Sequence, residues 1–279
     1  MKVAFVHRGN DGMASYKMRA AMPVEQLRAM GHEAYLNDGE GEVFVFSKPL
    51  WKEDYELALQ IKTAGAKVVV DIADYHYAKY SNVIQLADRV VTPTAKFRQR
   101  VLDDLRIDSV VIPEPYVQPE LAPHADGGER ILWFGSHVNL KDLDEVLPRL
   151  AGLDFHVVSA PNNRMHVTPW TPKNMTEELR RANLCIFPSR DNVEEKSAHR
   201  MVNAIRAGCF CVSDPHPAYD EFSDWMFTSG VLAGLDWCRK NRDSLNERVA
   251  KAQEYVRDRY SPQVVGKCWE NLLRDTLGD

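Results

Sequence analysis

The segment Glu195–Ser213, EKSAHRMVNAIRAGCFCVS, joins a helical pattern to an apolar strand-like run and decides the fold class. At about 100° per residue, a helix through it places Lys196, Arg200 and Asn203 within one narrow sector. We expect Gly208 to end this helix, and residues 209–213 to form a buried strand. A helix with one cationic face that leads directly into a buried strand is typical of an α/β protein with a parallel sheet.

The positive charges on this helix lie in its early turns. If Asp191 or Asn192 caps the helix, Lys196 and Arg200 stand where the helix dipole disfavours positive charge. A nearby anion removes that conflict, and a diphosphate suits both the free N–H groups of a helix start and a Lys/Arg pair. The alternative from this segment alone is a basic helix face in contact with solvent.

Strand-like and helical patterns alternate along the whole chain. In the first half, the predicted strands are 2–7, 42–47, 68–72, 89–92 and 109–113, and the predicted helices are 15–30, 53–63, 82–87 and 94–105. In the second half, the predicted strands are 131–135, 155–159, 184–187 and 209–213, the helices are 143–150, 176–182 and 195–208, and residues from 235 onward are helical. The pattern predicts two Rossmann-like halves with parallel sheets.

A segment rich in proline, glycine and charge, residues 113–128, separates the two halves and lacks periodicity. We interpret it as the interdomain linker. The predicted domains are therefore 1–126, with the linker, and 127–279, with the terminal helices.

Composition narrows the class of protein. The 279 residues carry a formal net charge of −5 and 44% hydrophobic residues, with no apolar run of membrane-spanning length and no pattern of a signal peptide. We expect a cytoplasmic protein without stable membrane insertion. The five cysteines form no CxxC pair and the nine histidines no HExxH pattern, so we expect reduced structural cysteines and no metal site.

The loop after the first strand argues against a dinucleotide-dependent dehydrogenase, because Gly9-Asn10-Asp11-Gly12 lacks the GxGxxG spacing. Over nearly its whole length the chain instead resembles GT-B glycosyltransferases, and more specifically the family-four-like retaining enzymes. The resemblance rests on ILWFGS at 131–136, similar to the strand and glycine loop beneath the donor phosphates, and on 195–208, similar to the E-x7-E helix region.

This resemblance implies a nucleotide-sugar substrate held mainly by the C-terminal half, and no separate cofactor. Gly135 and Ser136 would lie beneath the donor phosphates. Lys196 and Arg200 take the part of the basic pair that faces the diphosphate, and Lys141 is a further donor-side candidate, for which a solvent-facing helix start is the alternative.

The E-x7-E region departs from the family pattern at its second position. Glu195 stands at the first glutamate, which in the family contacts the transferred sugar. Asn203 replaces the second, which in the family binds the donor ribose. An amide both donates and accepts hydrogen bonds but binds a diol more weakly than a carboxylate does. If the alignment holds, Asn203→Glu should tighten ribose recognition.

The N-terminal half offers candidates for the acceptor side. Ser15 and Arg19 lie in the first predicted helix, similar to the first helix of the family, although ordinary capping also explains Ser15. Asp74 and His76 follow a predicted strand, and His7 ends another; the carboxyl ends of strands are where α/β sheets contact ligands. The alternative for each histidine is packing among loop aromatics.

The resemblance implies sugar transfer to an acceptor hydroxyl, with retention and without a metal ion. Cations at the diphosphate would stabilise the departing nucleotide, while Asp74 or His76 would orient the acceptor hydroxyl or accept its proton. The acceptor class stays open among a saccharide, a protein, a small molecule and a modified DNA base. Two alternatives are a nucleotide-sugar epimerase and a non-catalytic nucleotide-sugar-binding module.

Overall fold

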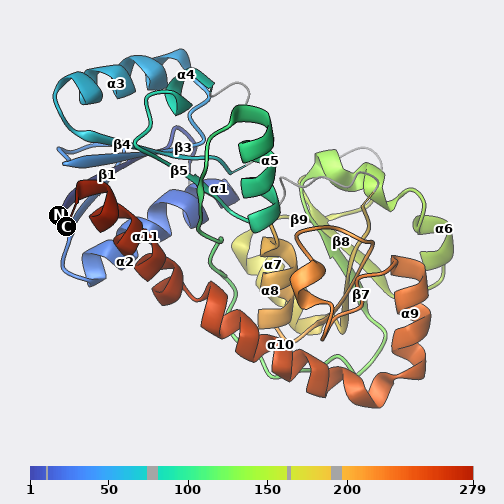
Figure 1. Cartoon of the computed structure of the whole chain (residues 1–279). Helices are drawn as coiled ribbons and strands as arrows, with labels where there is room; N and C mark the ends of the chain where they lie inside the picture. Colours follow the sequence, from blue (N-terminus) through green and yellow to red (C-terminus); the bar gives the residue numbers. More distant parts are fainter. Residues whose placement is uncertain (11, 74–80, 162–164, 190–196, 279) are drawn as a thin grey trace. The chain divides into compact units, whose positions relative to one another are not determined.

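The computed structural model describes residues 1–10, 12–73, 81–161, 165–189 and 197–278. By internal contacts the chain forms two compact units (Figure 1). Unit 1 comprises Met1–Pro115, Arg259–Asp279 and a short stretch that ends at Ser197, and unit 2 comprises Tyr116–Val193 and Ala198–Asp258. By this criterion the main boundaries follow residues 115 and 258, whereas the sequence-based division has one boundary, after residue 126.

Unit 1 is built on a sheet with the strand order β2-β1-β3-β4-β5-β6. All of its strand pairs are parallel, as the alternation of strands and helices predicts. The chain runs from β1 outward to β2 and then returns past β1 to β3, so the topological switch point lies between β1 and β3. The strands are β1 (Lys2–Val6), β2 (Glu33–Leu36), β3 (Val43–Ser47), β4 (Lys67–Asp71), β5 (Arg89–Thr92) and β6 (Val110–Val111).

Two strands of unit 1 differ from the prediction. The pattern does not predict β2, because its sequence EAYL contains no continuous apolar run and it lies at the sheet edge. β6 is shorter than the strand predicted over 109–113. The N–H of Ile112 still donates to the carbonyl oxygen of Thr92, but Pro113 has no N–H with which to continue the ladder.

Helices cover both faces of the unit 1 sheet: α2 and α11 lie against one face, α3 and α4 against the other (Figure 1). The helix predicted over 15–30 is three consecutive pieces, of which the middle one is a π-helical turn. The helices are α1 (Ala14–Tyr16), η1 (Lys17–Ala21), α2 (Met22–Ala29), α3 (Lys52–Thr63), α4 (Ser81–Ile84), α5 (Ala95–Leu105) and α11 (Pro262–Leu277).

The core between the unit 1 sheet and α2 explains why the C-terminal helix belongs to this unit. Trp269 of α11 is fully buried, and its ring meets that of Phe5 edge to face with centroids 5.3 Å apart. Val265 and Leu273 of the same helix join this cluster. Each fully buried side chain of this kind contributes about 1.5–3 kcal/mol, so α11 is an integral part of unit 1.

Unit 2 is built on a second parallel sheet, with the order β11-β10-β7-β8-β9. The chain runs from β7 through β8 to β9 and then returns past β7 to β10, so the switch point lies between β7 and β10. The pattern does not predict β9, which has only two residues. The strands are β7 (Ile131–Phe134), β8 (Phe155–Ser159), β9 (Thr168–Pro169), β10 (Leu184–Phe187) and β11 (Phe210–Ser213).

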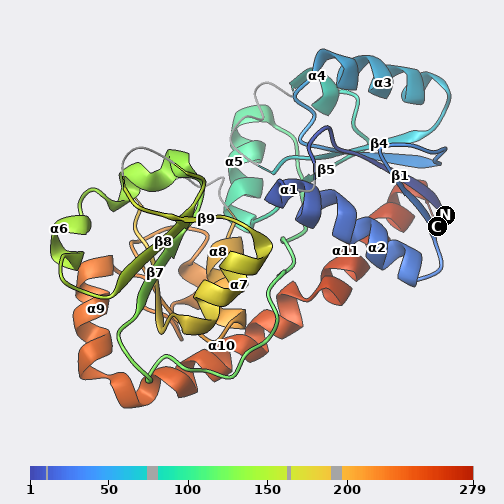
Figure 2. The ribbon, with the colours of Figure 1, turned by 180° about the vertical axis from the view of Figure 1, so that it is seen from behind.

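The unit 2 helices also lie on both sides of their sheet: α7 and α8 on one side of β7 and β8, α6 and α9 on the other (Figure 2). Of the helix predicted over 143–150, only Leu147–Leu150 is α-helical, because Pro148 is accommodated in a first turn; a separate 3-10 helix ends at Leu143. The helices are η3 (His137–Leu143), α6 (Leu147–Leu150), α7 (Pro172–Arg181), α8 (His199–Arg206), η4 (Asp220–Phe222), α9 (Val231–Lys240), η5 (Arg242–Ser244) and α10 (Leu245–Tyr260).

The segment Tyr116–Arg130, which covers most of the predicted linker, contains no helix or strand but is held by side chains of unit 2. The Asn246 amide oxygen accepts a hydrogen bond from the N–H of Ala125, and the Gln253 amide donates to the carbonyl oxygen of Leu121. The Asn183 amide oxygen accepts from the N–H of Arg130. Backbone groups that lack partners in secondary structure are thus satisfied by amide side chains.

All five cysteines are free thiols, as the sequence predicts. Cys185, Cys209 and Cys211 are fully buried in and next to β10 and β11, where they pack as small apolar side chains. Across the described residues, no helix is both long enough and apolar enough to cross a membrane.

Candidate functional site

The carboxyl ends of β7 and β10 lie side by side at the switch point of the unit 2 sheet. Phe134 ends β7 and Phe187 ends β10, and their rings meet edge to face with centroids 5.6 Å apart. Open parallel sheets bind ligands outside the carboxyl ends of their strands at this point. This edge is therefore the candidate site of unit 2.

Arg200, in the first turn of α8, reaches this edge. Its guanidinium lies over the ring of Phe187, 5.3 Å from the centroid. It donates to the carbonyl oxygen of Phe134 and to the hydroxyl of Tyr219, each at 3.4 Å, which is long for such bonds. Within the described part of the chain Arg200 has no ion-pair partner, so most of its donor capacity is unused.

Gly135 is the residue after β7, and its backbone lies close to the Arg200 side chain. A Cβ at residue 135 would lie 3.3 Å from Nη1 of Arg200 and 3.1 Å from the Trp133 ring, so a larger residue would press on both. The structure thus brings together two of the predicted donor-side residues. Ser136 and Lys141 are both exposed, at the start and within η3 respectively.

Asn203 is placed differently from these two residues. It is 5% exposed, and its amide oxygen accepts hydrogen bonds from the backbone N–H groups of Val117 and Gln118, at 2.8 and 3.0 Å. Its amide nitrogen donates to the carbonyl oxygen of His199 at 2.7 Å. Both ends of the amide are therefore engaged within unit 2, where they hold α8 to the segment that enters this unit.

Four of the predicted site residues lie outside the described residues: Asp74 and His76 on the acceptor side, and Glu195 and Lys196 on the donor side. The start predicted for the α8 helix falls in the same gap. The described part of α8 begins at His199, and Gly208, at φ +85°, follows its end as expected.

Sequence reasoning missed Phe187 and Tyr219, the two aromatic residues against Arg200. Phe187 is the last residue of a correctly predicted strand, so the rule that ligands contact carboxyl ends was enough to find it. Tyr219 lies in the loop after β11, and no motif marks it. Its ring packs against that of Phe187, with centroids 5.8 Å apart.

In unit 1, Arg19 lies in the interior rather than at a surface. It is fully buried in η1, donates two hydrogen bonds to the Asp71 carboxylate and donates a third to the carbonyl oxygen of Ile112. The Ser47 hydroxyl also donates to Asp71. Burial alone would lower the pKa of Arg19, but the Asp71 charge more than offsets it and raises the pKa.

His7 directly follows β1 and is 3% exposed. Its Nδ1 accepts a hydrogen bond from the N–H of Gly9 at 2.9 Å, and its ring meets Tyr16 edge to face. Its buried Nε2 has no hydrogen-bond partner among the described residues. Burial lowers the pKa of His7, and the charge of Lys48 lowers it further. The ring is thus neutral, with its proton on Nε2. Ser15 lies in α1, which Met13 precedes as N-cap residue.

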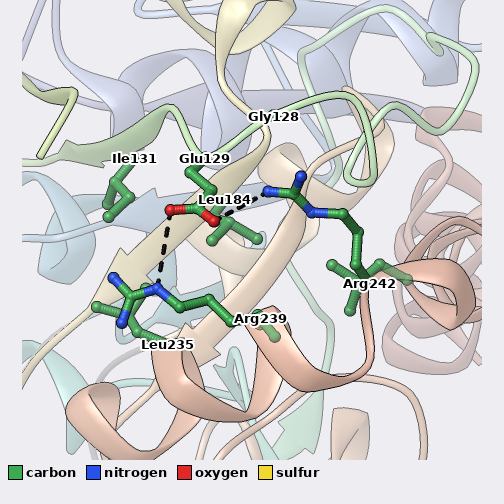
Figure 3. Close-up of a pocket in the computed structure, with 9 residues that line it drawn as sticks. Gly128, Glu129, Ile131, Leu184, Leu235, Arg239 and Arg242 are labelled. Carbon is green, nitrogen blue, oxygen red and sulfur yellow. Dashed lines mark hydrogen bonds and ion pairs between the residues drawn. The ribbon is translucent and has the colours of Figure 1, made fainter.

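Two hollows lie at the opposite, amino-terminal edges of the sheets. In unit 2, Glu129 pairs with Arg239 and Arg242 at 3.7 and 3.1 Å beside a cavity of about 10 Å³ at the starts of β7 and β10 (Figure 3). That volume suits about one water molecule. In unit 1, a hollow of about 650 Å³ is lined by residues at the starts of β5 and β6. Neither is at the edge where such sheets bind ligands.

No family model and no curated protein matches the chain. Solved structures do match. HepE of Anabaena, crystallised with UDP, is similar with a TM-score of 0.72 at 11% identity, over 99% of this chain and 100% of that one. AviGT4, a glycosyltransferase involved in avilamycin A biosynthesis, gives 0.61 at 15% identity, over 100% and 99%. A UDP-N-acetylglucosamine 2-epimerase gives 0.57 at 11% identity, over 100% and 97%.

At these identities the likeness concerns the fold. Each match extends over practically the whole of both chains, so it includes both units and the order of their strands and helices. Two Rossmann-like units, each on a parallel sheet with helices on both faces, agree with the expectation from sequence. The chain has the GT-B fold of glycosyltransferases.

Proposed function

We propose that this protein transfers a sugar from a nucleotide-sugar donor to a hydroxyl group of an acceptor, with retention and without a metal ion. The observation that supports transfer most directly is Arg200, a cation with unused donor capacity beside Gly135, at the switch point of unit 2. The nucleotide sugar is a substrate, and we propose no further cofactor.

The surroundings of Arg200 suit a diphosphate. Within the described residues its two hydrogen bonds are long and to neutral groups, so phosphate oxygens at about 2.7–2.9 Å would be stronger partners. Ala198, the N-cap residue of α8, has no side-chain oxygen with which to accept a hydrogen bond from the N–H groups of the first turn. A phosphate beside this turn would satisfy them and favour the adjacent charge.

The same arrangement would favour the chemical step. When the bond between the sugar and the nucleotide breaks, the departing diphosphate gains negative charge. A cation fixed beside it then binds the transition state more strongly than the ground state, which is what raises the rate. In the proposal Arg200 and Lys196 carry this charge, and that assignment is our reason for proposing transfer without a metal ion.

The remaining roles follow the resemblance in sequence. Glu195 contacts the transferred sugar, and Asp74 or His76 orients the acceptor hydroxyl and accepts its proton. Ser136 and Lys141 would be secondary donor-side contacts, since both are exposed at the turn after Gly135. Retention of the anomeric configuration is proposed on the same resemblance.

The first experiment is a thermal-shift and calorimetric titration of the full chain with UDP, GDP, ADP, dTDP, CMP and their common sugar conjugates. Ligands that bind the folded state raise its apparent stability. We expect one nucleotide class to raise Tm equally with and without EDTA, and Arg200→Ala to remove the shift. If no nucleotide raises Tm, the proposal is wrong; a shift abolished by EDTA would overturn the metal-independent part.

Two other classes of function are outcomes of the next experiment. The fold also occurs in a UDP-N-acetylglucosamine 2-epimerase, so the fold does not choose between transfer and epimerisation. Incubating the chain with the identified nucleotide sugar in the absence of acceptor distinguishes them: an epimerised product would replace the transferase proposal. Nucleotide binding without any turnover, unchanged in Asp74→Ala and His76→Ala, would indicate a non-catalytic binding module.

A further inference from the structure

The loop after β11 brings Tyr219 to the switch point of unit 2. Its sequence over 214–219 is DPHPAY, in which two prolines have a fixed φ and restrict the residue before each of them. The Asp214 carboxylate accepts hydrogen bonds from the N–H groups of Ser189, at 3.0 Å, and Val231, at 2.9 Å. The loop is thus fixed at its first residue and stiffened by its prolines.

Two other aromatic rings hold the side chain of Tyr219. Its ring centroid lies 4.9 Å from that of His216 and 5.8 Å from that of Phe187. The N–H of Tyr219 donates to the carbonyl oxygen of His216 at 2.8 Å, and Nδ1 of His216 accepts from the N–H of Ala218 at 3.1 Å. Tyr219 is 3% exposed. Packing therefore determines where its hydroxyl lies.

The hydroxyl of Tyr219 has an unused proton. Nη2 of Arg200 donates to the phenol oxygen at 3.4 Å, so in this contact the hydroxyl is only an acceptor. Among the described residues the O–H of Tyr219 has no acceptor of its own. A tyrosine hydroxyl that is buried usually has a hydrogen-bond partner, and an unsatisfied donor is costly. An oxygen atom of a ligand at this strand edge would explain it.

The spacing between the two donors suits one shared acceptor. At 3.4 Å, Nη2 of Arg200 and the Tyr219 oxygen are too far apart for a strong bond to each other. An anionic oxygen about 2.7 Å from each atom would make charge-assisted hydrogen bonds with both. Arg200 is half-buried, which leaves part of its side chain accessible to a ligand. The pair therefore favours an oxyanion.

We propose that Tyr219 binds the donor diphosphate directly, its O–H donating to a phosphate oxygen that also accepts from Nη2 of Arg200. The inference rests on the proposed function, for which it names a neutral donor beside the two cations. This donor comes from the loop after β11, whereas Phe187 and Gly135 come from the ends of β10 and β7. Three neighbouring strand ends thus contribute to the diphosphate site.

Tyr219 would also favour the reaction itself. The bond between the anomeric carbon and the diphosphate oxygen breaks, and its electron pair stays on the diphosphate. The acceptor oxygen bonds to the anomeric carbon, and its proton goes to Asp74 or His76, as proposed above. The O–H of Tyr219 binds the added negative charge more strongly than the ground state and is not transferred.

The test uses Tyr219→Phe, which removes one oxygen atom and keeps the ring that packs against Phe187. Calorimetric titration of the full chain with UDP, GDP, ADP, dTDP and inorganic pyrophosphate measures Kd. We expect Tyr219→Phe to weaken binding of each diphosphate that binds the parent by about tenfold or more, with Tm of the free protein unchanged. Tyr255→Phe is the matched control. It removes a hydroxyl that donates to Glu221 at 2.6 Å in the same unit, and should leave Kd unchanged.

A second background distinguishes direct contact from positioning of Arg200. Arg200→Lys keeps a positive charge but loses the planar group that reaches Tyr219. If Tyr219 donates to the phosphate, adding Tyr219→Phe to Arg200→Lys should still weaken pyrophosphate binding severalfold. An effect that disappears in this background would mean that Tyr219 acts only through Arg200, and would overturn the inference.

The outcomes separate this inference from the proposed function. If a nucleotide binds and Kd is equal in the parent and Tyr219→Phe, the role of Tyr219 is wrong and the proposed transfer stands. If pyrophosphate binding weakens in Tyr219→Phe but no nucleotide sugar is turned over, the anion site stands and the transfer is wrong. If neither pyrophosphate nor any nucleotide binds the parent, both are wrong.

Discussion

Arg19 of unit 1 and Arg200 of unit 2 both project from helices toward the carboxyl ends of a parallel sheet, but their surroundings differ. Arg19 is fully buried and bonded to a carboxylate and a carbonyl oxygen. Arg200 is half-buried and, within the described part of the chain, makes two long hydrogen bonds to neutral groups. A cation whose donors are used inside the protein fixes the fold, whereas one with unused donors is where an anionic ligand is expected.

The largest expected effect concerns the buried pair. Asp71→Ala leaves the Arg19 charge buried without its partner, which should reduce the free energy of unfolding by about 3–5 kcal/mol in urea denaturation. The double variant Arg19→Met, Asp71→Leu should recover most of the loss, because no charge stays buried. A loss below about 1 kcal/mol in the single variant would be typical of an exposed ion pair and would show that Arg19 does not stabilise the fold as a buried charge.

Arg200 should show the opposite behaviour. Arg200→Ala should lower kcat/KM for sugar transfer by about 10²–10³, as expected when a donor to the developing charge is removed, while its Tm stays close to that of the parent. Lys173→Ala removes an exposed charge from the same unit, 82% exposed, and should leave the rate unchanged. Equal rates in Arg200→Ala and Lys173→Ala would remove the diphosphate role.

Asn203 lies between these two cases, since it is close to Arg200 in α8 but bonded inside the protein. Asn203→Glu would bury a carboxylate and remove the donor to His199, so we expect unfolding to become easier by about 1–3 kcal/mol. Asn203→Asp keeps the acceptor for Val117 and should cost less. Tighter nucleotide binding in Asn203→Glu, with unchanged Tm, would instead support the ribose contact expected from sequence.

The smallest effects are in the pH dependence of stability, where the two units again differ. In unit 1, Glu270 is bonded to Lys267, His32 and Arg274, and these contacts lower its pKa from 4.5 to about 2. Because the folded pKa is below the unfolded one, its contribution is present above pH 4.5 and lost as the pH falls toward 2. Glu270→Gln should flatten the acid side of a Tm-against-pH curve.

In unit 2, His124 makes the stability of the folded protein depend on pH on the alkaline side. Its contact with the Cys209 sulfur raises its pKa from 6.5 to about 9, although burial opposes this; the carbonyl oxygens of Ala122 and Leu179 also raise it. A raised folded pKa means that the contribution is present below pH 6.5 and lost as the pH rises toward 9. His124→Gln should flatten the alkaline side of the same curve and leave the acid side unchanged.

The fold was largely predictable, because buried parallel strands are read as continuous apolar runs and glycines mark helix ends. Val43–Ser47 and Leu184–Phe187 show this clearly, since apolar runs coincide with the strands. β2 and β9 escaped because one is amphipathic and the other has two residues. The helix predicted over 143–150 is shorter in the structure, because a proline such as Pro148 fits the first turn of a helix but not its interior.

The candidate site was less predictable, because the partners of its residues are distant in sequence. Arg200 comes close to Gly135 because β10 lies beside β7 in the sheet, and the alternation of strands and helices in the sequence already suggests a sheet of this kind. The burial of Arg19 depends on Asp71, 52 residues away, and that of Asn203 on Val117, 86 residues away. No local pattern distinguishes a polar side chain that meets a ligand from one that meets such a distant backbone.

The return of α11 to unit 1 has a consequence for the order in which the protein is made. Trp269 completes the core around Phe5, yet it is translated after the whole of unit 2, which lies between residues 116 and 258. Domains generally fold as units during synthesis. We therefore expect unit 2 to close on the ribosome before unit 1, whose first strands emerge earlier but must wait for a helix from the far end of the chain.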